Sequence, residues 1–253
     1  MDAKIIAIVN HKGGVGKTTS VASVGSALAE LGKRVLLVDL DAQSNLTTSL
    51  LREEPDRTIY EAINEGKGLP VVPLGKGKSW SLVPASLDLA GTELEIASRI
   101  DREYLLKDLL EGVEAEYDYI LLDCPPSLGL LTINALVAAT DVVIPLTAEA
   151  LPSKGLQKIL DIVEKVQRRL NPSLLFSGII VTRYENSKLS QLVEDALRQN
   201  YGDKVFQTRI RKNVRIAEAP HSGEDILAYA PDSNGAEDYR QLAKELAEKI
   251  VIR

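Results

Sequence analysis

A short glycine-rich stretch, VNHKGGVGKTTS at residues 9–20, constrains the fold of this chain more than any other feature. It follows KIIAIVN (residues 4–10), an apolar run typical of a buried strand, and it precedes a helical pattern over residues 17–31. Its glycines let the backbone turn tightly and point consecutive N–H groups inward. The N-terminus of the following helix adds positive potential where a phosphate can sit. The stretch therefore predicts a strand, a phosphate-binding loop and a helix in succession.

The residues of this loop depart from the common phosphate-loop pattern, G-x-x-x-x-G-K-[ST], at one position. His11 stands where the first glycine belongs, and Lys12 adds a second lysine five residues before Lys17. Lys17 can reach the β- and γ-phosphates of a nucleotide, and Thr18 can place its hydroxyl on Mg²⁺. We expect Thr19 to assist through its own N–H and hydroxyl. The loop alone thus predicts these nucleotide-binding residues: Gly13, Gly14, Val15, Gly16, Lys17, Thr18 and Thr19.

Acidic residues close two further apolar strands. Asp123 ends YILLD, and Asp39 and Asp41 lie in VDLDAQSN at the end of the second strand. Strand alternation would point Asp39 and Asp41 to the same face. Asp123 is expected to act on the metal through its bound water, while one of the other two could fix the metal's waters and the other orient an attacking water. The predicted metal set is Thr18, Asp39, Asp41 and Asp123.

Apolar strands alternate with amphipathic helices along the rest of the chain. Continuous apolar strands between such helices indicate an α/β fold with a mostly parallel twisted sheet and helices on both faces. A segment rich in glycine, proline and lysine, residues 66–79, predicts a long surface loop. No linker interrupts the pattern, so we expect one domain over residues 1–253. Strands are predicted at 34–40, 80–85, 118–123, 141–146 and 174–182, and helices at 58–66, 87–112 in two pieces, 153–170, 188–200 and 235–250.

Composition excludes several classes of protein. The balance of 30 basic against 36 acidic residues gives a net charge of −6, whereas a protein that coats nucleic acid over its whole surface is basic. Any nucleic-acid contact must therefore be a local patch. A single cysteine, Cys124, permits no intrachain disulfide and fits a reducing cytosol, and with two histidines it makes a zinc site unexpected. No apolar run approaches the ~20 residues that span a bilayer.

Four blocks of sequence together resemble one known family. They are KGGVGKTT (12–19), VLLVDLDAQSN (35–45), YDYILLDCPPSLGLLTINAL (117–136) and NVRIAEAP (213–220), and they resemble the ParA/Soj partition ATPases in the family's own order over nearly the whole chain. This family belongs to the deviant Walker A class, which also contains MinD. The resemblance implies a deviant P-loop NTPase fold, an ATP- and Mg²⁺-dependent homodimer, and non-specific binding of double-stranded DNA. It also implies an ATPase that is weak alone and is stimulated by DNA and a ParB-type partner.

The resemblance also implies roles for single residues. Lys12 matches the signature lysine that contacts the nucleotide of the opposite subunit, and Lys17 matches the ordinary phosphate-loop lysine. Asp41 matches the switch I aspartate needed for hydrolysis, and Asp123 matches the Walker B acid. The catalytic set implied in this way is Lys12, Lys17 and Asp41.

Two further parts of the family pattern show departures in this chain. Arg211 and Asn213 fall where the family holds the adenine, and Asn213 is the stronger match because many relatives carry proline in place of Arg211. In switch I, Ala42 and Ser44 replace a frequent proline and glycine. We expect these two changes to alter the stiffness of the loop rather than its chemistry.

The segment RIRKNVR (residues 209–215) holds four cations and no acid. Such a run is usually only a solvated face, but Arg215 matches a DNA-contacting arginine of the family. A second such arginine precedes the helix at 188–200, where this chain offers Lys188, shifted by one position, with Arg183 nearby. The predicted DNA-binding residues are Arg183, Lys188, Lys212 and Arg215.

Other functions on the same fold stay open as alternatives. A MinD-like, membrane-associated regulator of division needs a C-terminal basic amphipathic helix with bulky apolar residues. Here the chain ends in YRQLAKELAEKIVIR, which is alanine-rich and is expected to pack on the domain, so we expect no membrane partner. A redox relative that holds an iron–sulfur cluster between two subunits needs two cysteines per chain, and this chain has one. A protein that binds nucleotide without hydrolysing it would not need the acids Asp41 and Asp123.

We expect a cytoplasmic, nucleoid-associated protein without the N-terminal helix-turn-helix extension of larger plasmid relatives. Its cargo could be a chromosome, a plasmid or a protein assembly.

Overall fold

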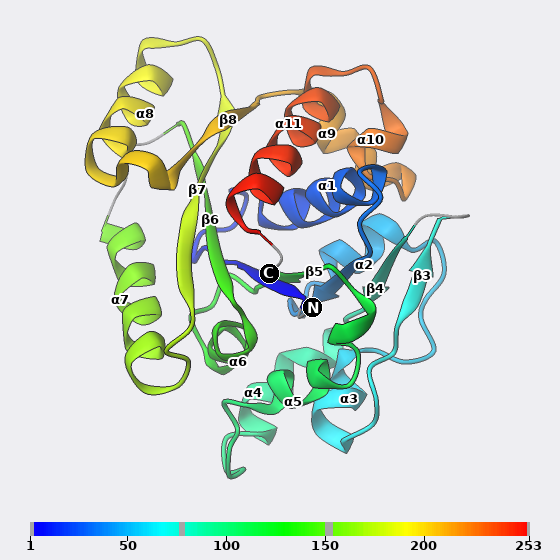
Figure 1. Cartoon of the computed structure of the whole chain (residues 1–253). Helices are drawn as coiled ribbons and strands as arrows, with labels where there is room; N and C mark the ends of the chain where they lie inside the picture. Colours follow the sequence, from blue (N-terminus) through cyan, green and yellow to red (C-terminus); the bar gives the residue numbers. More distant parts are fainter. Residues whose placement is uncertain (1–2, 76–78, 150–153, 252–253) are drawn as a thin grey trace.

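A single sheet organises the computed structural model, which describes residues 3–75, 79–149 and 154–251. In the described residues the sheet has eight strands in the order β3-β4-β2-β5-β1-β6-β7-β8 (Figure 1). Neighbouring strands are parallel except β3 and β4, which confirms the predicted mostly parallel sheet. The strands are β1 Lys4–Ile8, β2 Val35–Asp39, β3 Val72–Leu74, β4 Trp80–Val83, β5 Tyr119–Asp123, β6 Asp141–Thr147, β7 Leu175–Tyr184 and β8 Val205–Arg211.

Helices cover both faces of this sheet, as Figure 1 shows. One face packs against α1 and α11 with α10, and the other packs against α3, α5, α6 and α7. Alternate residues of β1 serve the two cores: Ile6 and Ile8 face α1, whereas Ile5 and Ala7 belong to the opposite core. The helices are α1 Lys17–Glu30, α2 Asn45–Leu50, α3 Ile59–Glu65, α4 Thr92–Glu95, α5 Leu105–Glu111, α6 Leu130–Ala138, α7 Lys154–Arg169, α8 Lys188–Tyr201, α9 Val214–Glu218, α10 Ile226–Tyr229 and α11 Asn234–Lys249.

Local sequence signals explain where several of these helices begin and end. Thr58 caps α3 in a reciprocal pair with Glu61, and Gly66 ends it with a left-handed φ of 67°. Together with these two cap residues, α3 covers the helix predicted over residues 58–66. Gly25 of α1 lies against Leu37 of β2 so closely that an added Cβ would collide with it. The missing side chain therefore lets α1 approach the sheet, and α1 carries the glycine-rich loop at its N-terminus.

The predicted surface loop at residues 66–79 is wrong in part. It contains β3, an edge strand that pairs antiparallel with β4, and its residues 76–78 lie outside the described part. Pro73 in the middle of β3 hid this strand, because proline is tolerated only at a sheet edge. The sequence also gave no helical signal for α6, whose nearly continuous apolar run has no 3.6-residue period.

The carboxyl ends of the central strands meet at one edge of the sheet. Ile8 of β1 lies opposite Asp123 of β5, and Asp123 in turn lies opposite Asp39 of β2. In open α/β sheets, this edge is where ligands bind. The register thus brings the glycine-rich loop and two of the predicted acids together.

The C-terminal helix α11 is part of the fold. Its apolar residues, including Tyr239, Leu242 and Leu246, are buried against α1 and β8, as its alanine-rich sequence predicts. Among the described residues, none of the helices has both the length and the hydrophobicity that a bilayer crossing requires.

Candidate functional site

The glycine-rich loop leaves β1 and enters α1 through two left-handed residues. Gly14 has a φ of 71° and Gly16 a φ of 88°, which only glycine adopts without strain. Gly16 is the N-cap of α1, and its carbonyl accepts the Ser20 N–H at 2.9 Å. His11 fills the place of the usual first glycine and packs its ring against Gly155 at the start of α7. The loop therefore has the backbone conformation of a phosphate-binding loop, with the His11 imidazole in place of the usual first glycine.

Two buried side chains, one at the start of the loop and one on β7, tether the loop to strands of the sheet. Asn10 donates from Nδ2 to the Pro145 carbonyl of β6 at 2.7 Å and accepts the Lys12 N–H at 3.0 Å. Thr182 of β7 donates from Oγ1 to the Val15 carbonyl at 2.9 Å. Neither residue was predicted from the sequence. An asparagine two residues before a turn does signal an Asx-turn, but nothing local points to Thr182.

The two lysines of the loop have different environments. Lys17 is 7% exposed, and its ammonium donates to the Lys12 carbonyl at 3.4 Å. It lines a cavity of about 680 Å³ together with Gly13, Gly14, Thr18 and Thr19. Lys12 is exposed and does not line this cavity. The structure thus brings Lys17 to the site within its own chain and leaves the Lys12 ammonium outside it.

Asp123 is a buried carboxylate that no hydrogen bond of normal length satisfies, although the neighbouring Thr18 hydroxyl and the Lys17 charge act to lower its pKa. It is 1% exposed at the end of β5, and neither of its oxygens has a partner in the described residues. Burial raises the pKa of Asp123 well above its usual range, and the negative charge of Asp39 raises it further. An unpaired buried carboxylate is costly unless a cation compensates it. Its position beside Thr18 therefore fits a hydrated Mg²⁺ ion.

Asp39 is also buried, but the chain itself occupies its oxygens. Oδ1 accepts the Asp41 N–H at 3.1 Å, and Oδ2 accepts the Thr47 N–H at 2.9 Å and the Thr47 hydroxyl at 2.7 Å. Burial raises the pKa of Asp39 to about 6, against the effect of these hydrogen bonds. The Thr47 hydroxyl accepts the Ala85 N–H at 2.9 Å. In this structure Asp39 anchors the segment that carries Asp41, and its predicted metal contact stays a prediction.

Asp41 lines the cavity from the loop that follows β2. Its Oδ1 accepts the Gln43 N–H at 3.0 Å, and its carbonyl accepts the Ser44 N–H at 2.8 Å. Ser44 has a φ of 46°, a left-handed conformation that strains a residue with a Cβ. Glycine, which is frequent at this position in the family, would adopt the same φ without strain.

The predicted adenine contacts, Arg211 and Asn213, do not line the cavity. Arg211 pairs with Asp238 at 2.6 Å and with Glu237 at 2.7 Å, and these hydrogen bonds raise its pKa. Asn213 caps α9 by accepting the Arg215 N–H at 2.8 Å. The far wall of the cavity is formed instead by Ile216, Ala219, Pro220, His221, Glu224, Asp225 and Ile226.

The far wall includes apolar side chains that suit the flat face of a base. The sequence signal for it lay inside the NVRIAEAP block, at its apolar positions rather than at Asn213. The adenine roles of Arg211 and Asn213 stay predictions.

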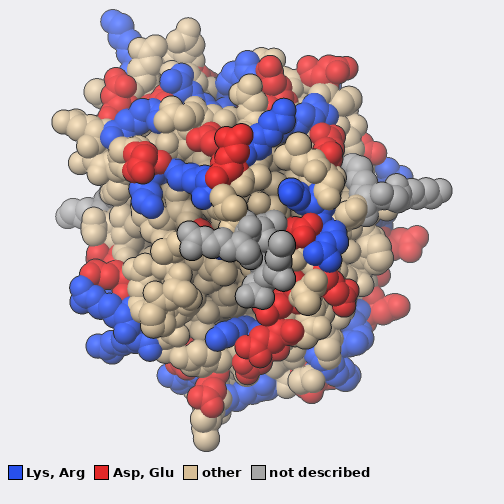
Figure 2. All heavy atoms as spheres, in the orientation of Figure 1, with Lys and Arg blue, Asp and Glu red and all other residues tan. Residues whose placement is uncertain are grey.

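Most of the predicted DNA-binding cations are paired within the chain. Arg183 lies 3.0 Å from Glu149, Lys212 lies 2.6 Å from Glu185, and Arg215 lies 3.0 Å from Glu218. Lys188, the first residue of α8, has no ion pair within residues 3–75, 79–149 and 154–251. Figure 2 shows the same balance as acidic and basic side chains interspersed over the face it presents.

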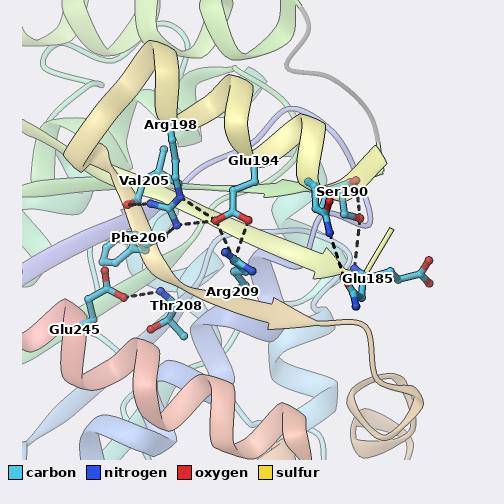
Figure 3. Close-up of polar contacts among 12 residues, drawn as sticks. Glu185, Ser190, Glu194, Arg198, Val205, Phe206, Thr208, Arg209 and Glu245 are labelled. Atoms are coloured by element: carbon cyan, nitrogen blue, oxygen red, sulfur yellow. Dashed lines mark hydrogen bonds and ion pairs between the residues drawn. The ribbon is translucent and has the colours of Figure 1, made fainter. Parts of the chain in front are cut away.

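The arginines around β8 belong to a partly buried network (Figure 3). Glu194 is 4% exposed on its side chain and lies between Arg198 at 2.8 Å and Arg209 at 2.9 Å. The Arg209 guanidinium lies over the Tyr184 ring, 4.7 Å from its centroid. Glu245 of α11 accepts the backbone N–H groups of Gln207 and Thr208 at the start of β8. These contacts hold α8, β8 and α11 together.

Comparison with known proteins identifies the relatives of this chain. The family model described as "AAA domain" matches residues 3–176. The sporulation initiation inhibitor protein Soj of Bacillus subtilis is 44% identical over 248 residues, which cover 96% of this chain and 98% of that protein. The chromosome partitioning protein ParA of Caulobacter vibrioides is 39% identical over 249 residues, with 96% and 93% of the two chains covered.

A solved structure has the same fold. The crystal structure named cobyrinic acid a,c-diamide synthase from Mycobacterium smegmatis, with bound ADP and magnesium, superposes with a TM-score of 0.83. The two sequences are 37% identical, and the superposition covers 96% of this chain and 93% of the other. The fold of this chain thus occurs in a protein whose crystal structure contains bound ADP and magnesium.

Proposed function

This chain belongs to the ParA/Soj family of chromosome-partitioning ATPases, and from that premise we propose that ATP-driven pairing of two copies switches its binding to DNA on and off. The observation that carries this proposal is the separation of the two lysines. Lys17 lines the cavity, whereas Lys12, in the same loop, is exposed and outside it. A lysine that does not serve its own site is available to a second copy.

The first part of the proposal is the binding of Mg-ATP within one chain. The triphosphate lies along the loop from Gly13 to Thr19, where consecutive N–H groups and the N-terminus of α1 favour negative charge. Lys17 binds the β- and γ-phosphates. Thr18 and Asp123 hold Mg²⁺, which would neutralise charge on the phosphate oxygens when bound. The unpaired oxygens of Asp123 support this assignment.

Hydrolysis then depends on Asp41, which lines the cavity and orients the attacking water. Its backbone is fixed by Asp39, whose own oxygens are occupied by Asp41 and Thr47. Asp39 thus positions the loop after β2, and Asp41 faces the nucleotide. The chain alone hydrolyses ATP slowly, because the site lacks the lysine of the second copy.

The second part is a symmetric dimer in which each Lys12 reaches the phosphates held by the other copy. A positive residue supplied in this way to a phosphoryl-transfer site is worth about 10³–10⁵ in rate. In a two-fold dimer the exchange is reciprocal, so both sites are completed together. ATP therefore controls both the pairing of the copies and the chemistry.

The third part is DNA binding by the dimer through Arg215, Lys188, Arg183 and Lys212. Three of these cations already have a carboxylate partner, so one copy attracts phosphate weakly. Two copies double the contacts, and the affinity falls steeply with added salt. A ParB-type partner stimulates hydrolysis, the dimer opens, and DNA is released. The protein works in the cytoplasm on the nucleoid, where repeated cycles move its cargo.

A MinD-like regulator on the membrane is the alternative function. It needs a C-terminal helix with free bulky apolar residues. Here the apolar residues of α11, such as Leu242 and Leu246, are buried in the domain. This packing weighs against the alternative.

Light scattering with and without ATP tests the proposal. Lys12→Ala should bind fluorescent ATP like the wild type but should remain a monomer, because its cavity is intact and its contribution to the second copy is gone. Lys33→Ala, which removes a half-buried lysine beyond the end of α1, is the control and should still dimerise. Normal dimerisation of Lys12→Ala would contradict the role proposed for this residue.

A further inference from the structure

Asn10 is a buried polar side chain at the start of the loop, and both ends of its amide are hydrogen-bonded. It is 1% exposed, and each end of its amide has one partner on a different segment. Nδ2 donates to the Pro145 carbonyl of β6 at 2.7 Å, and Oδ1 accepts the Lys12 N–H at 3.0 Å. Asn10 does not line the cavity, so it has no direct contact with a ligand held there.

The contact to Pro145 replaces a bond of the sheet. The Val9 N–H donates to the Val143 carbonyl at 3.1 Å, the last backbone bond between this segment and β6. Carbonyls that face the same neighbour recur every second residue in a parallel ladder, so the next one on β6 belongs to Pro145. The backbone has already turned away there, and the Asn10 side chain takes that carbonyl instead. The start of the loop is thereby fixed to a central strand.

The second contact of Asn10 fixes the backbone of Lys12, whose side chain is exposed. The Lys12 N–H is held by Asn10, and the Lys12 carbonyl accepts the Lys17 ammonium at 3.4 Å. Both polar groups of the Lys12 backbone are therefore restrained. The direction in which its four-carbon side chain leaves the loop is set before any second copy arrives, and such preorganisation lowers the entropy cost of forming the contact.

The other tether of the loop has a different effect. Thr182 holds the Val15 carbonyl, three residues further along and next to the two residues that open α1. Val15 is buried, whereas Lys12 is exposed. The two tethers thus divide the loop into a part that serves the chain's own cavity and a part that carries Lys12 outward.

We propose that Asn10 is a positioning residue for Lys12. It holds the backbone from which the Lys12 ammonium reaches the nucleotide of a second copy, and it acts on the partner's site rather than on its own. This inference rests on the proposed function, because it needs the trans role of Lys12.

The test compares Asn10→Ala with a matched loss elsewhere. Asn134 in α6 is a comparably buried amide: it is 2% exposed, donates to the Arg102 carbonyl at 2.8 Å and to the Leu130 carbonyl at 3.0 Å, and accepts the Leu106 N–H at 3.1 Å. Both alanine variants should lower the melting temperature by about 2–4 °C, the shift expected for a single moderate loss of stability in a chain of this size. ATP binding, measured by fluorescence, should stay within about threefold of the wild type in both.

Dimer formation and turnover should separate the two variants. Asn10→Ala should lose ATP-dependent dimers by about tenfold, the factor expected when a buried hydrogen bond to a working residue is lost. Asn134→Ala should dimerise like the wild type. Asn10→Ser keeps a hydroxyl that can accept the Lys12 N–H in the same turn, so it should recover part of the loss.

A mixing experiment identifies the copy on which Asn10 acts. A mixture of Asn10→Ala with Asp41→Ala should regain ATPase activity, because the Asn10→Ala copy keeps its own Asp41 and receives a correctly held Lys12 from its partner. Asn134→Ala should keep its ATPase activity on its own, so mixing it with Asp41→Ala should not raise that activity further. Absence of rescue in the Asn10→Ala mixture, while Lys12→Ala is rescued in the same way, would overturn the inference and leave the proposed function standing.

Two other results would also overturn it. One is normal dimerisation of Asn10→Ala, and the other is a loss of ATP affinity as large as the loss of dimers, which would place Asn10 in the chain's own site. If Lys12→Ala itself dimerises and hydrolyses normally, the trans role fails and the inference fails with it. Should Asn10→Ala not fold, Asn10→Ser and Asn134→Ser are compared by the same measurements.

Discussion

The loop at residues 10–18 and the surface around β8 both contain several cations, but the chain treats them in opposite ways. In the loop, the Lys17 ammonium donates to the Lys12 carbonyl, and neither lysine forms an ion pair with a carboxylate among the described residues. Around β8, Arg198, Arg209 and Arg211 all pair with carboxylates. The loop therefore keeps its positive charge for a ligand, whereas the β8 surface uses most of its charge to hold elements together.

This difference shows why a cationic sequence is weak support for a binding site. The segment 209–215 has four cations and no acid in the sequence, but its acids come from Glu185, Glu194, Glu218 and Asp238 in the fold. The glycine-rich loop has no such compensation among its own contacts. A charge is available for binding only when the fold does not already pair it.

The largest expected effect separates chemistry from binding at the cavity. Asp41→Ala should lower the ATPase rate by about 10²–10⁴, the usual cost of losing a group that handles the attacking water. ATP-dependent dimers and DNA binding should remain, because Lys12, Lys17 and the cations are intact. Single-turnover kinetics with a gel shift measures both, and normal hydrolysis would show that Asp41 has another role.

Loss of an acid from the β8 surface should lower the stability of the fold, because the arginines there hold structural elements together. Glu194→Ala leaves Arg198 and Arg209 without their shared partner and should lower the free energy of unfolding by about 2–3 kcal/mol. The effect is smaller than for a fully buried pair, because the arginine side chains keep 26% and 44% of their surface exposed. Urea unfolding measures it.

Glu164→Ala is the control for this change, since it removes the partner of Arg168 from an exposed pair on α7 and should cost below about 0.5 kcal/mol. Equal effects of the two variants would remove the distinction between the β8 network and an ordinary surface pair.

Arg215 tests whether a paired cation on this surface still binds DNA. Arg215→Glu should weaken binding of the ATP dimer about tenfold and should reduce the slope of log affinity against log salt by about two, one per copy. ATP binding should not change. Fluorescence anisotropy at several salt concentrations gives both quantities, with Arg168→Glu on α7 as the control for net charge. An unchanged slope would show that Arg215 serves only its contact with Glu218.

The smallest expected effect concerns the stiffness of the Asp41 loop. Ser44→Gly should raise the free energy of unfolding by about 0.5–1 kcal/mol, because relief of left-handed strain outweighs the added freedom of the unfolded chain. Asp101→Gly, at a φ of 58° far from the cavity, should stabilise similarly without changing the ATPase rate. Destabilisation by Ser44→Gly in chemical denaturation would show that the serine side chain is needed there.

The sequence predicted those parts of the molecule that depend on neighbouring residues. The helix at residues 58–66 and the glycine-rich turn before Lys17 were found because each needs only a few adjacent residues. The sequence also predicted that Asp39 and Asp123 end strands of a mostly parallel sheet, and the structure adds the register that places them opposite each other.

Contacts between distant segments could not be predicted in this way. Asn10 meets Pro145 and Thr182 meets Val15 across more than a hundred residues, and no local period encodes either contact. The same reason explains why Asp39 was expected to bind metal. Its Thr47 and Asp41 partners become visible only when the loop after β2 has folded back onto it.

The central claim is that Lys12 completes the site of a second copy, and a subunit-mixing ATPase assay tests it most directly. Lys12→Ala and Asp41→Ala are each expected to be nearly inactive alone. Because Lys12→Ala copies do not pair with one another, they are free in an equal mixture to pair with Asp41→Ala copies. About half of the Asp41→Ala copies are then in mixed dimers, and each mixed dimer has one site with an intact Asp41 and a Lys12 from the partner. The account predicts recovery of roughly a quarter of the wild-type rate in the two-fold dimer. No recovery, with mixed dimers demonstrably formed, would show that Lys12 acts within its own chain.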